Sequence, residues 1–160
     1  MEKKIKTLYV AHTFVYRHFV KDKLCKFLHK IGIDTNNPFY LKDGSTVRPE
    51  VTLADKMEIE GIDPDTNKAW LNMIKQSSES IVTTDLQLID KSDGIVAFMS
   101  SWSGGTTCEI FYTGFVRKKP VFLISNNISI YRHPWMMESC KYGKIFKSYE
   151  AFKDYMRKNL

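Results

Sequence analysis

The chain has 160 residues, of which 43% are hydrophobic and 26% charged, and its formal net charge is +6. This length suffices for one compact domain with a hydrophobic core and is short for two, so we expect residues 1–160 to form a single domain. The basic excess consists of scattered lysines, which is typical of a solvated surface, so we expect no nucleic-acid partner.

The remaining composition predicts a soluble protein of the cytoplasm. The three cysteines have no CxxC spacing, which indicates reduced thiols and no zinc site. No apolar stretch approaches the roughly 18 residues of a membrane span, and the amino terminus has no signal-peptide core. We therefore expect neither membrane contact, nor a metal, nor a cofactor.

The first part of the chain predicts a strand, a helix and then an irregular region. Residues 5–11 form a β-branched and aromatic run, and apolar residues recur at helical spacing from 15 to 30, before Gly32. Residues 33–66 are dense in turn signals such as Asp43-Gly44 and Asp63-Pro64-Asp65. These signals predict one short strand among loops.

The rest of the chain alternates helices with strands. A long helix is expected from 70 to 89, with Ser77-Ser78 as the candidate point of a break. Further strands are expected at 94–99 and 121–124, with 144–146 as a candidate edge strand, and further helices at 106–117, around 136–137 and at 146–156. This alternation predicts an α/β fold, with a five-stranded, mostly parallel sheet flanked by helices, of the flavodoxin-like or Rossmann-like kind.

Two loops carry the polar residues with which such a sheet binds ligands at the carboxyl ends of its strands. His12 and Thr13 follow the first strand, and the stretch SWSGGTTCE, residues 101–109, follows strand 94–99. The second loop leads into a helix whose N–H groups and dipole favour an anion or an oxygen-rich ligand. The alternative is an ordinary helix start, in which Thr106 is the N-cap and Glu109 closes a capping box.

Residues 85–124 resemble the core signature of the nucleoside 2-deoxyribosyltransferase family, which includes the 2-deoxynucleoside 5'-monophosphate N-glycosidases. The matching pattern has two aspartates eight residues apart, an apolar strand, a hydroxyl and a glycine before a glutamate, and a Lys-Pro-led strand. Its members here are Asp85, Asp93, Ser103, Gly105, Glu109 and Lys119-Pro120. Weaker similarity reaches both ends of the chain and leaves residues 33–80 unmatched.

The resemblance implies cleavage or transfer at the N-glycosidic bond of a (deoxy)nucleoside or nucleoside 5'-monophosphate. Glu109 would attack the anomeric carbon to form a glycosyl-enzyme ester, and Asp85 would protonate or hydrogen-bond the departing base. Tyr9 would orient the nucleophile, Ser103 would bind the 5' group and Gly105 would allow close approach. Water or a second base would resolve the ester, so hydrolase and transferase both stay open.

Other candidate contacts each have a structural alternative. His12 and Thr13 are expected at the substrate, although a histidine departs from the small, Gly-containing loop of the family, and a partly exposed strand-end histidine is the alternative. Trp102 is a candidate for stacking on the base or for a surface lid. Asp93 is a candidate substrate contact or accepts backbone N–H bonds at the helix-to-strand turn, and Tyr9 is alternatively a core aromatic residue.

The carboxyl-terminal region bears on whether the chain assembles with copies of itself. Many transferases of the family complete a neighbouring subunit's site with an Asn-bearing loop, where this chain has residues 131–135, YRHPW. Arg132 and His133 are expected instead to meet a phosphate across a dimer interface, which favours a nucleotide substrate and a homodimer or larger homo-oligomer. Two other functions stay open, namely an NAD-type glycohydrolase and a non-catalytic nucleotide-binding sensor module.

Overall fold

The computed structural model describes residues 4–159 and has a five-stranded sheet at its centre. The strand order is β2-β1-β3-β4-β5, and every pairing is parallel. The strands are β1 (Thr7–His12), β2 (Asp34–Asn36), β3 (Gly94–Phe98), β4 (Val121–Ile124) and β5 (Lys144–Phe146). The predicted α/β fold, with its short second strand and edge strand, is confirmed.

Helical segments connect the strands in sequence order. The α-helices are α1 (Arg17–Phe19), α2 (Lys26–Lys30), α3 (Pro49–Ile59), α4 (Lys68–Lys91), α5 (Gly104–Phe111), α6 (Ile128–Tyr131), α7 (Pro134–Ser139) and α8 (Tyr149–Asn159). Single turns of 3-10 helix are η1 (Phe14–Tyr16) and η3 (Pro64–Thr66), and π-helical segments are η2 (Val20–Cys25) and η4 (Tyr112–Val116).

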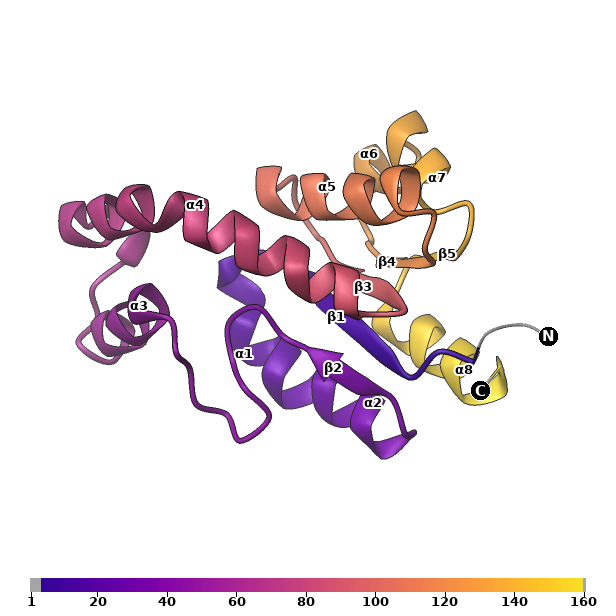
Figure 1. The fold of residues 1–160 in the computed structure, drawn as a ribbon, viewed down its shortest axis with the longest axis horizontal. Helices are drawn as coiled ribbons and strands as arrows, with labels where there is room; N and C mark the ends of the chain where they lie inside the picture. The colour runs from indigo at the N-terminus through magenta and orange to yellow at the C-terminus, as the bar shows by residue number, and fades with distance from the viewer. Residues whose placement is uncertain (1–3, 160) are drawn as a thin grey trace.

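The sheet separates two helical layers because side chains alternate along each strand. Leu8 and Val10 of β1 belong to the core shared with the α1–α2 segment and α8. Tyr9 and Ala11 belong to the core on the other face, with residues of α4 to α7. Figure 1 shows α4 and α5 on one side of the strands and α1, α2 and α8 on the other.

An arm formed by α3 and the amino-terminal half of α4 extends past the sheet (Figure 1). Ala54, Met57 and Trp70 form its own small core, against which Phe14 packs from the turn after β1. The carboxyl-terminal half of α4 then lies beside β1 and β3 of the sheet. No helix within residues 4–159 is both long and apolar enough to cross a membrane.

The helices differ from the sequence-based expectation at three places. Helix α3 lies in the region that we expected to be loops, and it was missed because its amphipathic pattern is weak. It begins at Pro49, a residue that suits the first turn of a helix. Helix α4 is unbroken, since Ser78 donates its hydroxyl hydrogen to the Lys75 carbonyl at 3.1 Å and stays within the helix. The helix expected from residue 15 to 30 is interrupted by the π-helical segment η2.

The alternative interpretation of residues 101–109, a capping box at the helix start, is also wrong. Helix α5 begins at Gly104 with Ser103 at the N-cap position, and no side chain caps it. Thr106 is buried inside the helix rather than at its start. Glu109 therefore has no capping partner and is free for another role.

Candidate active site

The carboxyl ends of β1 and β3 lie side by side, with His12 paired to Phe98 in the strand register. The chain leaves β1 toward β2 on one side and arrives in β3 on the other. In open parallel sheets, the connections that follow two such neighbouring strands turn to opposite sides of the sheet, and ligands bind in the crevice between them. The loops after β1 and β3, which we expected to carry the chemistry, both begin at this point.

Glu109 and Tyr9 form the centre of this region, one hundred residues apart in sequence. The Tyr9 hydroxyl donates to Glu109 Oε1 at 2.7 Å. Tyr9 is fully buried on the face of β1 that packs against α5. Burial raises the pKa of Glu109 to about 8, against the opposing effect of the Tyr9 hydrogen bond, and the nearby Asp85 raises it further.

Asp85 reaches the same region from α4. Its Oδ1 lies 3.6 Å from Arg48 Nη1, beyond hydrogen-bonding distance, and this oxygen is buried without any hydrogen-bond partner in the described structure. Burial raises the pKa of Asp85 to about 6; the Arg48 charge opposes this, and Glu50 adds to it. Burial therefore raises the pKa of both carboxyl groups, and that of Glu109 more than that of Asp85.

Arg48 and Glu50 were not predicted, since both lie in the stretch whose fold the sequence left open. Arg48 donates from Nε to Glu50 Oε1 and from Nη1 to the Pro38 carbonyl at 2.9 Å. Glu50 is 3% exposed, so its charge is held against the guanidinium. The sequence signal that could have predicted this helix is the Arg-Pro-Glu stretch at the start of α3, because proline is common in a first helical turn. The loop 101–109 has no basic residue, and the structure brings Arg48 near Asp85 from this arm.

His12 and Thr13 contribute two more polar atoms without partners. The His12 Nδ1 hydrogen is donated to the Val10 carbonyl at 2.8 Å, which leaves Nε2 as an acceptor, and Nε2 is buried with no partner. Burial lowers the pKa of His12 to about 4, so the ring is neutral. Thr13 Oγ1 is likewise buried and unpartnered. The alternative of a partly exposed strand-end histidine is wrong, because His12 is 4% exposed and packs edge-on against Phe39.

The comparisons with known proteins bear on this arrangement. No protein-family model and no curated protein sequence matches the chain. A solved structure of a 2-deoxyribosyltransferase from the psychrotolerant bacterium Bacillus psychrosaccharolyticus matches with a TM-score of 0.60 and 18% identity, over 93% of this chain and 91% of that one. The two proteins share a fold. Because the likeness covers 93% of this chain, it includes most of residues 33–80, which the sequence signature left unmatched.

Asp93 lies away from the other predicted residues. It precedes β3 at the amino end of the sheet, and its Oδ2 accepts the backbone N–H groups of Lys6 at 2.9 Å and Thr7 at 3.1 Å. The crevice is at the opposite end of the same strands. The substrate contact expected of Asp93 is therefore wrong, and the alternative holds: the Asp93 carboxylate joins β1 to the turn before β3.

Ser103 and Gly105 lie where α5 begins, at the mouth of the crevice. Ser103 is half-buried, and its hydroxyl caps no backbone group. A Cβ added to Gly105 would meet nothing within 4 Å, so the backbone there is open to an incoming molecule. The substrate contacts expected of Ser103 and Gly105 stay predictions.

Trp102 and His133 are brought together, but on the other side of α5 from Glu109. Their rings lie 5.2 Å apart, and both line a groove with Thr107 and Phe111. Positions 107 and 111 share one face of a helix, whereas 109 points nearly the opposite way. Within one chain, Trp102 and His133 therefore do not meet the Glu109 carboxyl, and Arg132 is exposed beside them.

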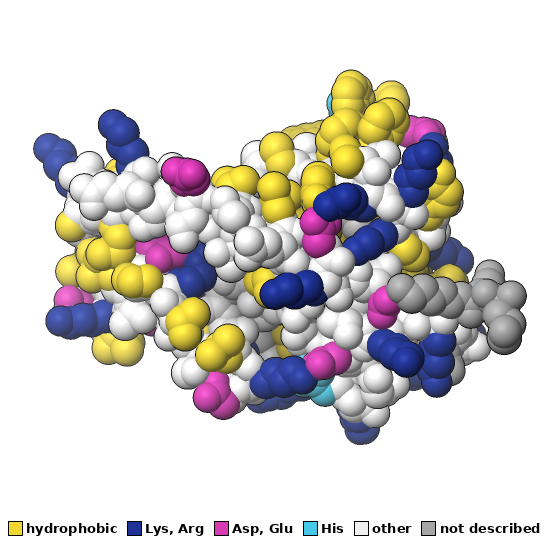
Figure 2. All heavy atoms as spheres, viewed as in Figure 1, with side chains coloured by type: hydrophobic (Ala, Val, Ile, Leu, Met, Phe, Trp, Pro, Cys, Tyr) yellow, Lys and Arg dark blue, Asp and Glu magenta, His cyan; other side chains and the backbone are white. Residues whose placement is uncertain are grey.

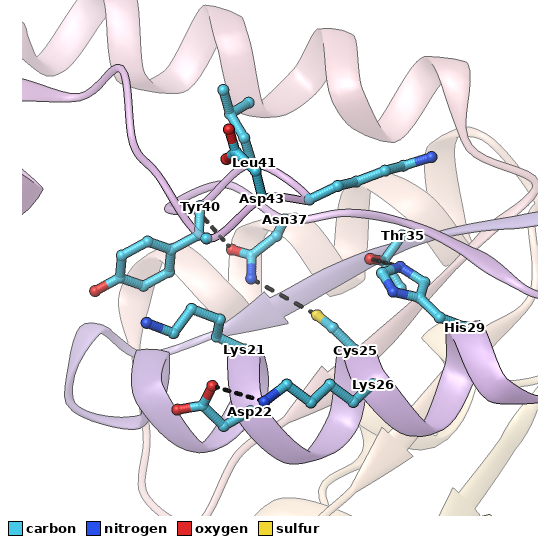
Figure 3. Close-up of a pocket in the computed structure, with 12 residues that line it drawn as sticks. Lys21, Asp22, Cys25, Lys26, His29, Thr35, Asn37, Tyr40, Leu41 and Asp43 are labelled. Carbon is cyan, nitrogen blue, oxygen red and sulfur yellow. Dashed lines mark hydrogen bonds and ion pairs between the residues drawn. The ribbon is translucent and has the colours of Figure 1, made fainter.

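A cavity of about 390 Å³ lies elsewhere, between the η2–α2 segment and the loop after β2 (Figure 3). Its polar groups largely satisfy one another: His29 pairs with Thr35 at 2.8 Å, and Asn37 bonds the Cys25 sulfur at 3.7 Å. The crevice, by contrast, keeps buried polar atoms without partners. Unpartnered buried atoms are costly unless a ligand completes them, so we place the candidate site at the crevice.

Proposed function

We propose that the chain is an enzyme of the nucleoside 2-deoxyribosyltransferase family that cleaves or transfers at the N-glycosidic bond of a nucleoside. The observation that carries this proposal is the Tyr9–Glu109 pair with Asp85 beside it, at the switch point of a fold shared with a 2-deoxyribosyltransferase. Residues 1–160 would act as one catalytic domain.

The proposed reaction uses the two carboxyl groups in different roles. Glu109 attacks C1' of the sugar through Oε while the C1'–N bond breaks, and the bonding electrons leave with the base. Asp85 supplies a proton to the departing base or hydrogen-bonds it. Water or a second base then attacks C1', frees the Glu109 carboxylate and loses a proton, which gives hydrolysis or transfer. The step needs Glu109 as a carboxylate, and because burial raises its pKa to about 8, Glu109 must give up its proton before it attacks.

The charges around Glu109 favour a nucleoside over its 5'-monophosphate. Arg48, the cation that α3 brings, is already paired with Glu50 and lies beside Asp85. This cluster offers no net positive charge to a phosphate dianion. Ser103, at the open start of α5, would then hydrogen-bond a neutral 5'-hydroxyl.

The test is release of free base, followed by chromatography, from deoxynucleosides, deoxynucleoside 5'-monophosphates and NAD. We expect release from deoxynucleosides, loss of release in Glu109→Ala, and unchanged release in the matched surface variant Glu79→Ala. Release from NAD alone would favour the glycohydrolase, and ligand binding without any release would favour the sensor module. Full activity of a folded Glu109→Ala protein would overturn the nucleophile assignment.

We further propose a homodimer or larger homo-oligomer. Exposed apolar side chains gather over α6 and α7 (Figure 2), and Trp135 is 63% exposed, Met137 55% and, on η4, Phe115 52%. Monomeric proteins rarely leave such large residues together in water. A facing subunit would bring Arg132 and His133 toward a neighbour's site. Light scattering after gel filtration tests this: we expect an oligomer that Trp135→Glu weakens, and a monomeric wild type would overturn it.

A further inference from the structure

The polar groups around Asp85 have hydrogen-bonding capacity that the protein itself does not use. Arg48 carries five N–H hydrogens, of which Nε serves Glu50 and Nη1 serves the Pro38 carbonyl. Within residues 4–159, Nη2 of this guanidinium donates no hydrogen bond. The adjacent Asp85 Oδ1 and the His12 Nε2 are buried acceptors without donors. The site therefore presents an unused donor beside unused acceptors.

Phe39 holds these groups in one neighbourhood. The Arg48 guanidinium lies 5.2 Å from the centre of the Phe39 ring, and the His12 ring meets the same ring edge-on at 4.9 Å. Arg48 is further fixed by buried Glu50, and its side chain is only 14% exposed. A guanidinium held from three directions cannot turn away from a ligand at low cost, so its chemistry selects the ligand.

We propose that Arg48 is a specificity-determining residue that restricts the departing base to oxo-bases, meaning 6-oxopurines and 4-oxopyrimidines. Arginine has donors and no acceptor, and it keeps its proton at any working pH. The base atom that faces it is therefore an acceptor. The oxygen at position 6 of guanine and position 4 of thymine is an acceptor, whereas adenine and cytosine carry an amino donor there.

The neighbouring acceptors complete the match. In an oxo-base, the carbonyl oxygen adjoins a ring N–H, and this N–H would donate to Asp85 Oδ1 or His12 Nε2. In an amino-base the order is reversed. Its amino group would face the Arg48 N–H donors, and the lone pair of the adjacent ring nitrogen would face the buried acceptors. Sites built on buried polar groups reject analogues that leave those groups unpaired.

This inference rests on the proposed function, and deoxyinosine and deoxyadenosine test it directly, since the two differ only at positions 6 and 1 of the purine. We expect kcat/KM to favour deoxyinosine by about 10- to 100-fold, the range of one well-formed base contact. Deoxyuridine against deoxycytidine repeats the comparison on pyrimidines. A wild-type preference for the amino-base of each pair would overturn the proposal without any variant.

Arg48→Gln is the matched variant, because an amide offers both a donor and an acceptor and can pair with either base type. We expect the deoxyinosine preference to shrink at least tenfold. Arg48→Gln combined with Glu50→Gln removes the carboxylate that would otherwise be buried without its partner, so folding is protected. An unchanged preference in a folded variant would contradict the role of Arg48.

Calorimetry with free hypoxanthine and adenine separates recognition from catalysis. Tighter binding of hypoxanthine, weakened in Arg48→Gln, supports the base preference even if no nucleoside is cleaved, in which case only the proposed enzymatic function fails. Equal binding of the two bases by the wild type would overturn the base preference, whatever the turnover.

Discussion

Replacing Glu109 with glutamine removes the buried ionisable group of the candidate site while keeping its shape. The Tyr9 hydroxyl, which donates to Glu109 Oε1 at 2.7 Å, can donate to the amide oxygen in the same way. The variant therefore differs from the wild type chiefly in whether the side chain titrates. We expect Glu109→Gln to be inactive but more stable than the wild type at neutral and alkaline pH.

The size of the effect follows from the pKa of Glu109, which burial raises from 4.5 to about 8. Below pH 4.5 the carboxyl is protonated in both states, and its contribution to wild-type stability is fully present. As pH rises from 4.5 to about 8, the unfolded chain ionises and the folded one does not, so stability is progressively lost. At about 1.4 kcal/mol per pKa unit, the full loss is on the order of 5 kcal/mol.

Thermal unfolding followed by circular dichroism at pH 5, 7 and 9 measures this difference. The melting temperature of Glu109→Gln should exceed that of the wild type by an amount that grows by roughly 10 °C between pH 5 and pH 9. Glu79→Gln, at an exposed position of α4, should track the wild type throughout. A gap between Glu109→Gln and wild type that stays constant with pH would refute the reasoning that burial holds this carboxyl protonated.

Three further changes test the site and its frame. Tyr9→Phe removes the hydrogen bond that lowers the pKa of Glu109, so the pKa should rise further and kcat/KM at pH 7 should fall about 10- to 100-fold, with the rate recovering toward higher pH in a pH–rate profile. Arg17→Met strips the cation, 1% exposed, from two carboxylates and should cost about 3 kcal/mol in urea unfolding. Gly114→Ala places a methyl group against the Ser139 carbonyl and should cost about 3 kcal/mol in the same assay by forcing α7 away, whereas a neutral result would contradict the packing of η4 on α7.

Local patterns determined the sheet and the chemistry of its central loops. The strands are short apolar runs of about the lengths expected, and alternation of strands with helices leads to a parallel sheet. The carboxyl-end rule then places the loops after β1 and β3 together, whereas Tyr9, Glu109 and Asp85 were expected in one site only from the resemblance of residues 85–124 to a family signature. Their distances were not predictable, because hydrogen-bond geometry between residues one hundred apart depends on how α4 and α5 pack on the sheet.

Only the tertiary structure decided which charged groups surround Glu109. Helix α3 could not be recognised among the turn signals around it, because its buried residues lack a clear helical periodicity. These residues pack within the arm rather than in the main core. Its position brings Arg48 and Glu50 near Asp85, whereas Asp93, before β3, and Trp102, on the other side of α5, lie apart from this cluster. The sequence by itself thus determined the fold and the candidate nucleophile, whereas the pKa values and unpartnered donors and acceptors arose from burial, which long-range packing alone creates.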